Sequence, residues 1–363
     1  MIVSLWGYYG FNYGDDIMMK VLIEELTKKK VKVILVDSHN GKLKDMMTES
    51  ENLEIIDFFN LTKGQKIRML YRLARTAHLN FWGGGTVFTD VDGDGNFKSF
   101  LLLKLFGGKI GYISVGIGDM KKISRKLKTN ILIKVSDIIT LRDKVSYSLS
   151  KNINSKNSFY CEDITYYYFN SFKSKINCID NKVKNQSYLL VSIRNLVKYF
   201  GVEKETEFSE QITQLIPKLM ERYNLNRVIF LPLDIKDIEI NEKIRQSLDK
   251  SINAICLTNQ NIDYMTEIIK NADIYISGRL HGSVAGEFFG VNTISLSYSN
   301  KINYFYDSIQ FPYFIDLRND NITLENVENI INKRREKHES LFWEKYSKNS
   351  YNNIIYLLDS LKG

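Results

Sequence analysis

The stretch ADIYISGRLHGSVAGEFFG (residues 272–290) passes from a strand to a helix within a few residues. Its opening, ADIYI, is the kind of apolar run that ends a buried strand, and the apolar residues of VAGEFF (284–289) recur at helical spacing. Gly290 stands where a glycine commonly ends a helix. Arg279 and His281, each beside a glycine, are therefore expected at or just before a helix N-terminus.

The same strand-then-helix pattern recurs along the chain in two series. Alternation of this kind predicts parallel sheets with helices on both faces. We expect an α/β protein of two Rossmann-like domains facing a cleft: residues 1–172, then 187–310, followed by a C-terminal helical tail over 311–363. The polar stretch Lys173 to Gln186 is expected to be a linker. The predicted strands are 2–9, 31–37, 79–83, 109–116 and 137–143 in the first series, and 188–195, 227–234, 254–258, 272–278 and 291–297 in the second.

Composition narrows the class of protein. The chain has 363 residues, which is long for one domain, and its 44% hydrophobic content is sufficient for well-filled cores. Its three cysteines form no CxxC pair, its first residues lack a basic signal-peptide region, and no apolar run is long enough to span a bilayer. We therefore expect a cytoplasmic protein. The net charge of +8 suits an anionic ligand, but no nucleic-acid-binding motif accompanies it, so nucleic acid is not predicted as a partner.

Two glycine-rich loops follow predicted strands of the first series. GYYGFNYGDD (7–16) does not have the G-x-G-x-x-G spacing of a dinucleotide site, and its Asp15 or Asp16 is equally well interpreted as a ligand contact or a helix cap. FWGGGTVFTD (81–90) places Gly83, Gly84 and Gly85 at a strand end, where open α/β sheets bind ligands. We favour a ligand site over a plain tight turn for this second loop.

The acidic run DVDGDG (90–95) copies the opening of a calcium-binding loop. The match fails at the twelfth position, where Leu101 stands in place of the bidentate glutamate. No metal site is predicted. An acidic loop lining a sugar site, or a solvated turn, is the favoured interpretation.

Cationic side chains recur at the ends of the predicted strands. Arg142 and Arg194 each end an apolar run, and Arg279, His281 and Lys301 follow later ones. The alternative for Arg142 is a structural ion pair with a neighbouring carboxylate such as Asp143. Taken together, the five residues form the pattern that a small, doubly anionic ligand requires. A histidine among such cations is also a candidate general acid.

The order of these motifs resembles that of the polysaccharide pyruvyl transferase family. The resemblance covers roughly residues 5 to 305 and is strongest at G-R-L-H. Members look like glycosyltransferases of the GT-B type, and they transfer the pyruvyl group of phosphoenolpyruvate to two hydroxyls of a sugar as a cyclic ketal. The matching motifs are N-x-G-D (Asn12 to Asp15), G-G-G with Asp90 (Gly83 to Gly85), G-I-G (Gly116 to Gly118), R-D-x-x-S (Arg142 to Ser146), Asp163, and G-R-L-H-x-x-x-x-G (Gly278 to Gly286) with Lys301.

The resemblance implies a role for each matching residue. His281 would be the general acid, with Arg279, Lys301 and Arg142 as further catalytic groups, and domain 187–310 would bind the donor. Domain 1–172 would face the acceptor sugar, and no cofactor beyond the donor substrate is implied. A lipid-linked acceptor would bring the protein to the inner face of the membrane. The implied donor-binding residues are Arg194, Arg279, Leu280, His281 and Lys301, and the implied acceptor-binding residues are Asn12, Asp15, Gly83, Gly84, Gly85 and Asp90.

Two other classes of function stay open from the residues alone. The first is a nucleotide-sugar glycosyltransferase of the same two-domain fold, although the E-x7-E pattern of many such enzymes is missing because Ser295 follows Glu287 at that spacing. The second is a non-catalytic assembly partner that has lost turnover. Departures from the family pattern, such as Asp119 after Gly118 where proline is common, leave the acceptor sugar open.

Overall fold

The computed structural model describes residues 1–10, 12–39, 41–91, 93–173, 187–258, 260–335 and 341–362. The chain divides into two compact units, which are described separately below. The N-terminal unit comprises Met1–Phe172 together with Leu341–Gly363, and the second unit comprises Lys173–Ser340. The residues of the predicted tail, 311–363, are thus shared between the two units.

The N-terminal unit is built on a parallel sheet that is eight-stranded within the described residues. Its order, β3-β2-β1-β4-β6-β7-β8 with β5 beside β6, reverses direction between β1 and β4, as in a Rossmann fold. Its central strands are buried along their whole length, which explains their continuous apolar sequences. The strands are β1 (Ile2–Trp6), β2 (Lys32–Asp37), β3 (Leu53–Asp57), β4 (Leu79–Gly83), β5 (Thr86–Phe88), β6 (Ile110–Ile117), β7 (Ile138–Leu141) and β8 (Ser158–Tyr160).

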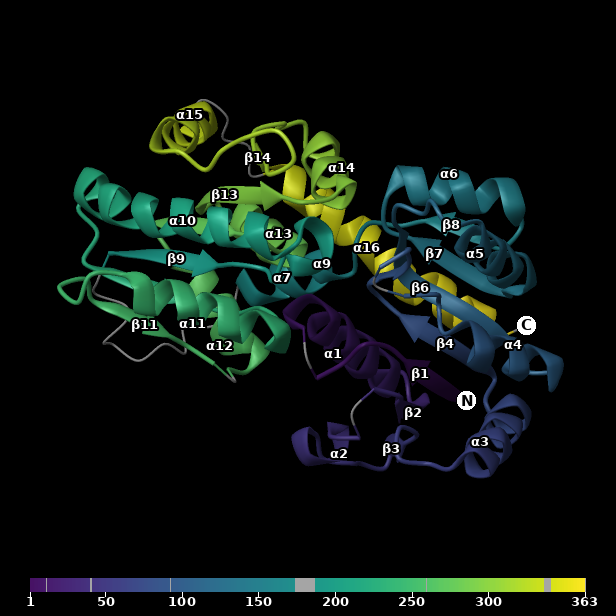
Figure 1. Ribbon diagram of the computed structural model, residues 1–363. Coiled ribbons are helices and arrows are strands. Elements are labelled where there is room, and N and C mark those ends of the chain that lie inside the picture. The colour runs from purple at the N-terminus through teal and green to yellow at the C-terminus, as the bar shows by residue number, and fades with distance from the viewer. Residues whose placement is uncertain are drawn as a thin grey trace. The chain divides into compact units, whose positions relative to one another are not determined.

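Helices cover both faces of this sheet (Figure 1). One face carries the aromatic core around Trp6, Trp82 and Phe100, to which α3, α4 and α5 contribute. On the other side α1 packs against α16 and against β4. The helices are α1 (Tyr13–Lys28), α2 (Leu43–Met46), α3 (Lys63–Thr76), α4 (Phe97–Leu105), α5 (Ile123–Val135), α6 (Lys144–Ile153), α7 (Thr165–Lys173) and α16 (Leu341–Ser360).

The last helix, α16, belongs to the N-terminal unit because buried polar groups bind it to the sheet. The hydroxyl of Thr140 donates to Asn353 Oδ1 at 2.5 Å, and Asn353 Nδ2 donates to the carbonyl of Glu162 at 2.8 Å. Asn353 is fully buried. The same Thr140 hydroxyl accepts from the backbone N–H of Ser114, which has a left-handed φ of 57° within β6. The chain end thus completes the core of the unit in which the chain begins.

The second unit repeats the Rossmann arrangement with a six-stranded sheet. Its order is β11-β10-β9-β12-β13-β14, and its described strand pairs are all parallel. The direction reverses between β9 and β12. The strands are β9 (Tyr188–Ser192), β10 (Arg227–Phe230), β11 (Ala254–Cys256), β12 (Ile274–Ser277), β13 (Asn292–Ser297) and β14 (Ile315–Asp316), and the helices are α9 (Val197–Phe200), α10 (Val202–Tyr223), η1 (Ile235–Asp237), α11 (Ile238–Ser247), α12 (Ile262–Lys270), α13 (Leu280–Phe289), α14 (Asn300–Ser308) and α15 (Leu324–Arg335).

The predicted fold class is confirmed: both units are Rossmann-like α/β domains. Each strand predicted from the sequence is present, although most end earlier than the apolar run that indicated them. Four strands, β3, β5, β8 and β14, were not predicted, and the last three have only two or three residues each, too few to carry a strand pattern. Residues 174–186 of the predicted linker lie outside the described residues.

Candidate functional site

The candidate site of the second unit lies where β9 and β12 run side by side with their following loops, at the reversal of strand order. Open α/β sheets bind ligands at this point. The glycine before Arg279 allows the two loops to meet: the N–H of Gly278 donates to the Ser192 carbonyl at 2.7 Å, and a Cβ on Gly278 would lie 2.9 Å from the backbone nitrogen of Arg194. Any larger residue would force the loops that carry Arg194 and Arg279 apart.

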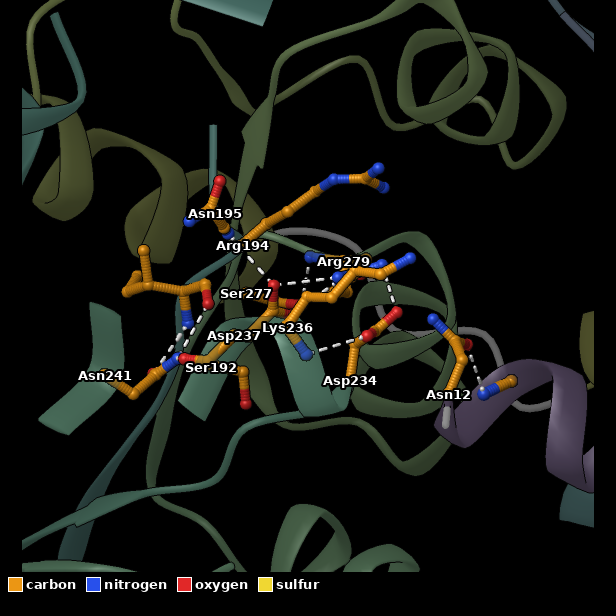
Figure 2. A network of polar contacts seen from close by, with 12 residues as sticks. Asn12, Ser192, Arg194, Asn195, Asp234, Lys236, Asp237, Asn241, Ser277 and Arg279 are labelled. Carbon is orange, nitrogen blue, oxygen red and sulfur yellow. Dashed lines mark hydrogen bonds and ion pairs between the residues drawn. The ribbon is translucent and has the colours of Figure 1, made fainter. Parts of the chain in front are cut away.

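Arg279 is held by two carboxylates, Asp234 and Asp237, from the short helix η1 and its N-cap, which follow strand β10 (Figure 2). Its Nε donates to Asp237 Oδ2 at 2.7 Å and its Nη2 to Asp237 Oδ1 at 2.8 Å, while Nη1 lies 3.2 Å from Asp234 Oδ2. The Arg279 side chain is 11% exposed and that of Asp237 is completely buried. Burial opposes the charge on Arg279, but the two carboxylates outweigh it and raise its pKa above the ordinary value.

The loop after β9 is fixed by hydrogen bonds to its backbone (Figure 2). Asn241 accepts from the N–H of Ile193 at 2.9 Å and donates to the carbonyl of the same residue at 2.7 Å. Asp237 Oδ1 accepts from the N–H of Asn195 at 2.9 Å. Because Asp237 contacts both this loop and Arg279, it couples the ends of β9 and β12. Neither aspartate was predicted from the sequence: Asp234 is the last residue of a predicted strand, and Asp237 follows three positions later.

Two of the predicted donor-binding cations, Arg194 and Lys301, contact one tyrosine. Arg194 donates to the Tyr298 hydroxyl through Nη1 and lies over the Tyr298 ring, with 4.5 Å between Cζ and the centroid. Lys301 Nζ lies 5.1 Å from the centroid of the same ring. Burial alone would raise the pKa of Tyr298, but the charges of Arg194, Lys301 and Arg279 lower it overall. The ring of Tyr199 completes the group, 4.8 Å from that of Tyr298. Tyr298 and Tyr199 were not predicted.

Two helices begin at this edge of the sheet. The N-cap of α13 is Arg279, so Leu280 and His281 occupy the first turn, and the N-cap of α14 is Ser299, two residues before Lys301. In neither helix does the N-cap side chain accept from the backbone. The buried hydroxyl oxygen of Ser299 makes no hydrogen bond among the described residues. Backbone N–H groups in this state, together with the helix dipole, favour an anion.

The far end of α13 is anchored away from these groups. Glu287 is 7% exposed, and its carboxylate pairs with Arg334 of α15 and accepts from the Tyr306 hydroxyl at 2.7 Å. Arg334 also donates to the carbonyl of Thr293 at 2.9 Å. Glu287 is thus engaged in packing α13 against α14 and α15, and Gly290 ends the helix with a φ of 76°, as the sequence predicted.

In the N-terminal unit, the two glycine-rich loops meet at the corresponding reversal between β1 and β4. The N-cap of α1 is Asn12, which accepts from Gly14 N at 3.0 Å, so neither Asp15 nor Asp16 caps this helix. Gly84 and Gly85 have φ values of 81° and 83°, and a Cβ on Gly85 would lie 2.8 Å from Asp15 Oδ1. The structure therefore brings the Asp15 carboxylate against the glycine run.

Further contacts keep the two loops together. The buried Tyr9 hydroxyl donates to the Gly83 carbonyl at 2.7 Å, and Asp16 Oδ1 accepts from Gly10 N at 2.6 Å. Burial raises the pKa of Tyr9 well above its ordinary value, and the charges of Asp15 and Asp16 raise it further. Asn12, Asp15 and Gly83 to Gly85 thus belong to one cluster.

Asp90 belongs to a different set of contacts. Its carboxylate accepts from the backbone N–H groups of Lys121 and Lys122, at 2.6 and 3.2 Å through Oδ2, just before α5 begins. The hydrogen bond from Lys121 N is the main cause of its lowered pKa. Asp94 accepts from Lys128 Nζ at 3.0 Å, and Asp92 lies outside the described residues. Among the described residues, no three His, Cys, Asp or Glu side chains gather as a metal site requires.

Arg142 is paired with Asp163, not with Asp143. Its Nη1 donates to Asp163 Oδ2 at 3.0 Å and its Nη2 to the Thr86 hydroxyl at 2.5 Å, and the Arg142 side chain is 7% exposed. Asp143 instead caps α6 by accepting from Ser146 N at 2.7 Å. The R-D-x-x-S motif thus combines an ordinary helix cap with an arginine that joins the end of β7 to the start of β5 and to the loop after β8.

None of the described helices is long and apolar enough to cross a membrane. A family model described as polysaccharide pyruvyl transferase matches residues 12–300. No curated protein matches the chain.

Solved structures with the same fold are numerous. UDP-GlcNAc 2-epimerase from Neisseria meningitidis, bound to UDP-GlcNAc, superposes with a TM-score of 0.69 at 14% identity, covering 99% of both chains. The UDP-GlcNAc 2-epimerase from Methanocaldococcus jannaschii gives 0.66 at 12% identity over 99% of both chains. Anabaena Alr3699/HepE in complex with UDP-glucose gives 0.57 at 9% identity, covering 99% of this chain and 98% of that one. At these identities the likeness shows the fold alone.

Proposed function

The chain belongs to the polysaccharide pyruvyl transferase family, and we propose that it transfers the pyruvyl group of phosphoenolpyruvate to two hydroxyls of a sugar. The product is a cyclic ketal on a cell-surface polysaccharide or on its lipid-linked precursor, and inorganic phosphate is released. The observation that carries this proposal is the contact of Arg194 and Lys301 with Tyr298, beside two helix N-termini.

Phosphoenolpyruvate carries a carboxylate and a phosphate, so its site must supply several fixed positive groups. Lys301 and Arg194 provide two full charges at the end of the second sheet, and the starts of α13 and α14 add backbone N–H groups. Charge-assisted hydrogen bonds to such anions are each worth roughly 1.5–3 kcal/mol. A site of this composition prefers a small dianion to a neutral sugar.

Arg279 is assigned a partly different role from the one that the motif implied. Two carboxylates already compensate its charge, so it adds less to the positive potential than its position in the sequence indicates. We propose that Arg279 contacts the donor through the outer edge of its guanidinium while Asp237 and Asp234 fix its orientation. It also holds the start of α13, and with it Leu280 and His281, against η1.

The proposed reaction begins with a proton from the His281 imidazolium to C3 of the donor, which converts the methylene into a methyl group. C2 becomes an oxocarbenium-like centre, and the first sugar hydroxyl attacks it while its proton returns to the imidazole. The bond between C2 and the phosphate oxygen then breaks, with Lys301 and Arg279 stabilising the departing phosphate. The second hydroxyl closes the ring at C2, and its proton leaves with the phosphate.

The acceptor is proposed to use the N-terminal unit. Support comes from the cluster of Asn12, Asp15 and the Gly83 to Gly85 run, which brings a carboxylate against a glycine turn at the reversal of strand order. Asp90 is a weaker candidate because its carboxylate is already occupied by the N–H groups before α5. Arg142 remains a candidate catalytic group by resemblance, although Asp163 and Thr86 hold its side chain.

Release of phosphate or of nucleotide separates this function from the nucleotide-sugar alternative. The solved structures of similar fold include complexes with UDP-GlcNAc and UDP-glucose, so those two compounds are the fitting competitors. Each donor is incubated with the protein and with lipid-linked oligosaccharide from the native cell. Phosphate release with phosphoenolpyruvate and a gain of one pyruvyl group in the acceptor, seen by mass spectrometry, are expected. Release of UDP without consumption of phosphoenolpyruvate would overturn the proposal, and so would binding of either donor without any turnover.

A further inference from the structure

Four helices of the N-terminal unit, α3, α4, α5 and α6, pack in series along one side of its sheet (Figure 1). Their charge is one-sided. α3 carries five Lys or Arg residues, α4 two, α5 four and α6 two, and none of the four helices contains an Asp or a Glu. By contrast α1, on the other side of the sheet, contains four acidic residues. We call the outer surface of α3 to α6 the basic face.

Neighbouring acidic residues compensate only a minority of these charges. Asp94 pairs with Lys128 and Arg125, Asp137 pairs with Lys104, and Glu54 lies 3.8 Å from Arg72. Most of the remaining cations of the basic face are exposed to solvent. The face therefore has a strong net positive charge.

The basic face also exposes a cluster of large apolar side chains, which is not expected of a surface that contacts only water. On α5 they recur every four residues and form a stripe beside the buried face of the helix; pairs with the same spacing occur on α3 and α6. Ile123 is 75% exposed and Leu105 is 72% exposed. Among the described residues of the second unit, only Val202 and Ile235 are exposed large hydrophobic residues. The exposed apolar residues of the basic face are Ile67, Tyr71, Leu105, Ile123, Leu127, Ile131, Val145 and Leu149.

Exposed aliphatic side chains set among lysines suit the surface of an anionic bilayer. The aliphatic groups enter the boundary between head groups and acyl chains, while the lysines contact lipid phosphates. Nucleic acid would use the lysines but gains little from isoleucine and leucine, since it is bound by phosphate contacts and aromatic stacking. A second copy of the chain would bring two positive faces together, which electrostatic repulsion disfavours.

We propose that the basic face is a docking surface for an anionic membrane, on which the protein lies peripherally. The proposal stands on the surface of α3 to α6 alone and does not depend on which reaction the protein catalyses. It accords with the finding that no described helix can cross a membrane. Docking by this face would hold the N-terminal unit beside any lipid-linked acceptor.

The test is co-sedimentation of the full chain with vesicles of phosphatidylcholine, with and without phosphatidylglycerol, at low and high ionic strength. Binding is expected only with the anionic vesicles and only at low salt. Lys98→Gln/Lys126→Gln/Lys134→Gln should weaken this binding about a hundredfold, since each cation near the surface contributes several-fold. Leu105→Ser/Ile123→Ser/Leu127→Ser should weaken it at least tenfold while leaving the charge unchanged.

Two matched controls lie on the second unit, where Val202, Lys218, Lys243 and Lys250 are also exposed. Val202→Ser and Lys218→Gln/Lys243→Gln/Lys250→Gln should bind vesicles as the parent chain does. Circular dichroism and thermal unfolding check that each variant folds. The proposal is overturned if the parent chain does not bind anionic vesicles at low salt. It is equally overturned if the control variants of the second unit lose as much binding as the variants of the basic face. Full vesicle binding by Leu105→Ser/Ile123→Ser/Leu127→Ser would also contradict it. Tighter binding of an oligonucleotide than of the vesicles would indicate a nucleic-acid partner instead. Conversion of a dimer into a monomer by the same three serine changes, seen in sedimentation velocity, would indicate an interface between two copies of the chain.

Discussion

Arg279 and Asp237 form a two-pronged ion pair, with Nε to Oδ2 at 2.7 Å and Nη2 to Oδ1 at 2.8 Å, although the two residues are 42 positions apart in the chain. Asp237 is completely buried, and Asp234 adds a second carboxylate at 3.2 Å. The strongest motif in the sequence therefore has a structural requirement in addition to any contact with the donor.

This pair predicts that Arg279→Ala will affect folding as well as binding. Removal of the guanidinium leaves two buried carboxylates uncompensated, so the free energy of unfolding should fall by about 3–5 kcal/mol. Donor affinity of the remaining folded protein should fall at least tenfold. Urea unfolding and titration with phosphoenolpyruvate measure the two effects. The double variant Arg279→Ala/Asp237→Asn should recover part of the stability but none of the affinity. An Arg279→Ala variant of parental stability would contradict the structural role.

His281→Gln should reduce turnover with phosphoenolpyruvate by about 10²–10⁴-fold, because in the proposed reaction the imidazole delivers the proton to C3. Fold and most of the donor affinity should remain, since the residue lies in the first turn of α13 and is not buried in the core. In heavy water the ketal methyl should carry deuterium. His78→Gln, which changes an exposed histidine of the N-terminal unit, is the matched control. Near-normal turnover of His281→Gln would exclude it as the general acid.

Tyr298 should ionise at a lower pH than an ordinary tyrosine, because the nearby charges of Arg194, Lys301 and Arg279 outweigh its burial. Phenolate absorbance in the ultraviolet should show one early step that Tyr298→Phe abolishes. Phosphoenolpyruvate bound among the same cations should move this step to higher pH, because it adds negative charge beside the phenolate. If phosphoenolpyruvate does not change the pH at which this early step occurs, the donor binds elsewhere.

The buried carboxyl group of Glu162 should make the stability of the N-terminal unit depend on pH. Burial raises its pKa to about 7, against an ordinary value of 4.5, while the hydrogen bond from Tyr160 works in the opposite direction. The folded state therefore binds more protons than the unfolded state between these values, so this group's contribution to stability is full at lower pH and is lost as the pH rises through about 7.

Glu162→Gln should make the protein more stable than the parent at about pH 8, by roughly 1–3 kcal/mol, and change little near pH 4. Urea unfolding at the two pH values measures the difference. The exposed Glu24→Gln on α1 is the control and should shift neither midpoint. Equal effects of Glu162→Gln at both pH values would show that the carboxyl titrates normally.

Removal of divalent metal should leave activity intact. In the proposed site, arginine and lysine side chains compensate the charge of the donor, and no metal-binding group of side chains occurs among the described residues. Activity is compared before and after dialysis against a chelator. A large loss that magnesium, manganese or calcium restores would contradict a donor site built from side chains and helix N-termini alone.

The sequence by itself determined the architecture of the protein. It also determined at which edge of each sheet the cationic residues that follow the strands lie. Buried parallel strands require continuous apolar runs, and helices require the 3.6-residue period, so both appear in any short window of the chain. The residues that follow such a strand must lie at its carboxyl end. For this reason Arg142, Arg194 and Arg279 could be assigned to sheet edges without a structure.

Only the tertiary structure decided which partners these residues have. Arg142 is paired with Asp163, 21 positions away, instead of with its neighbour Asp143, and Arg194 meets Tyr298 across 104 positions. Thr140 and Asn353, 213 positions apart, attach the last helix to the first sheet. Contacts of this kind depend on how crossovers order the strands and on which side chains remain uncompensated after burial. Local periodicity carries neither kind of information, because a pattern specifies a residue's face and not the residue opposite to it.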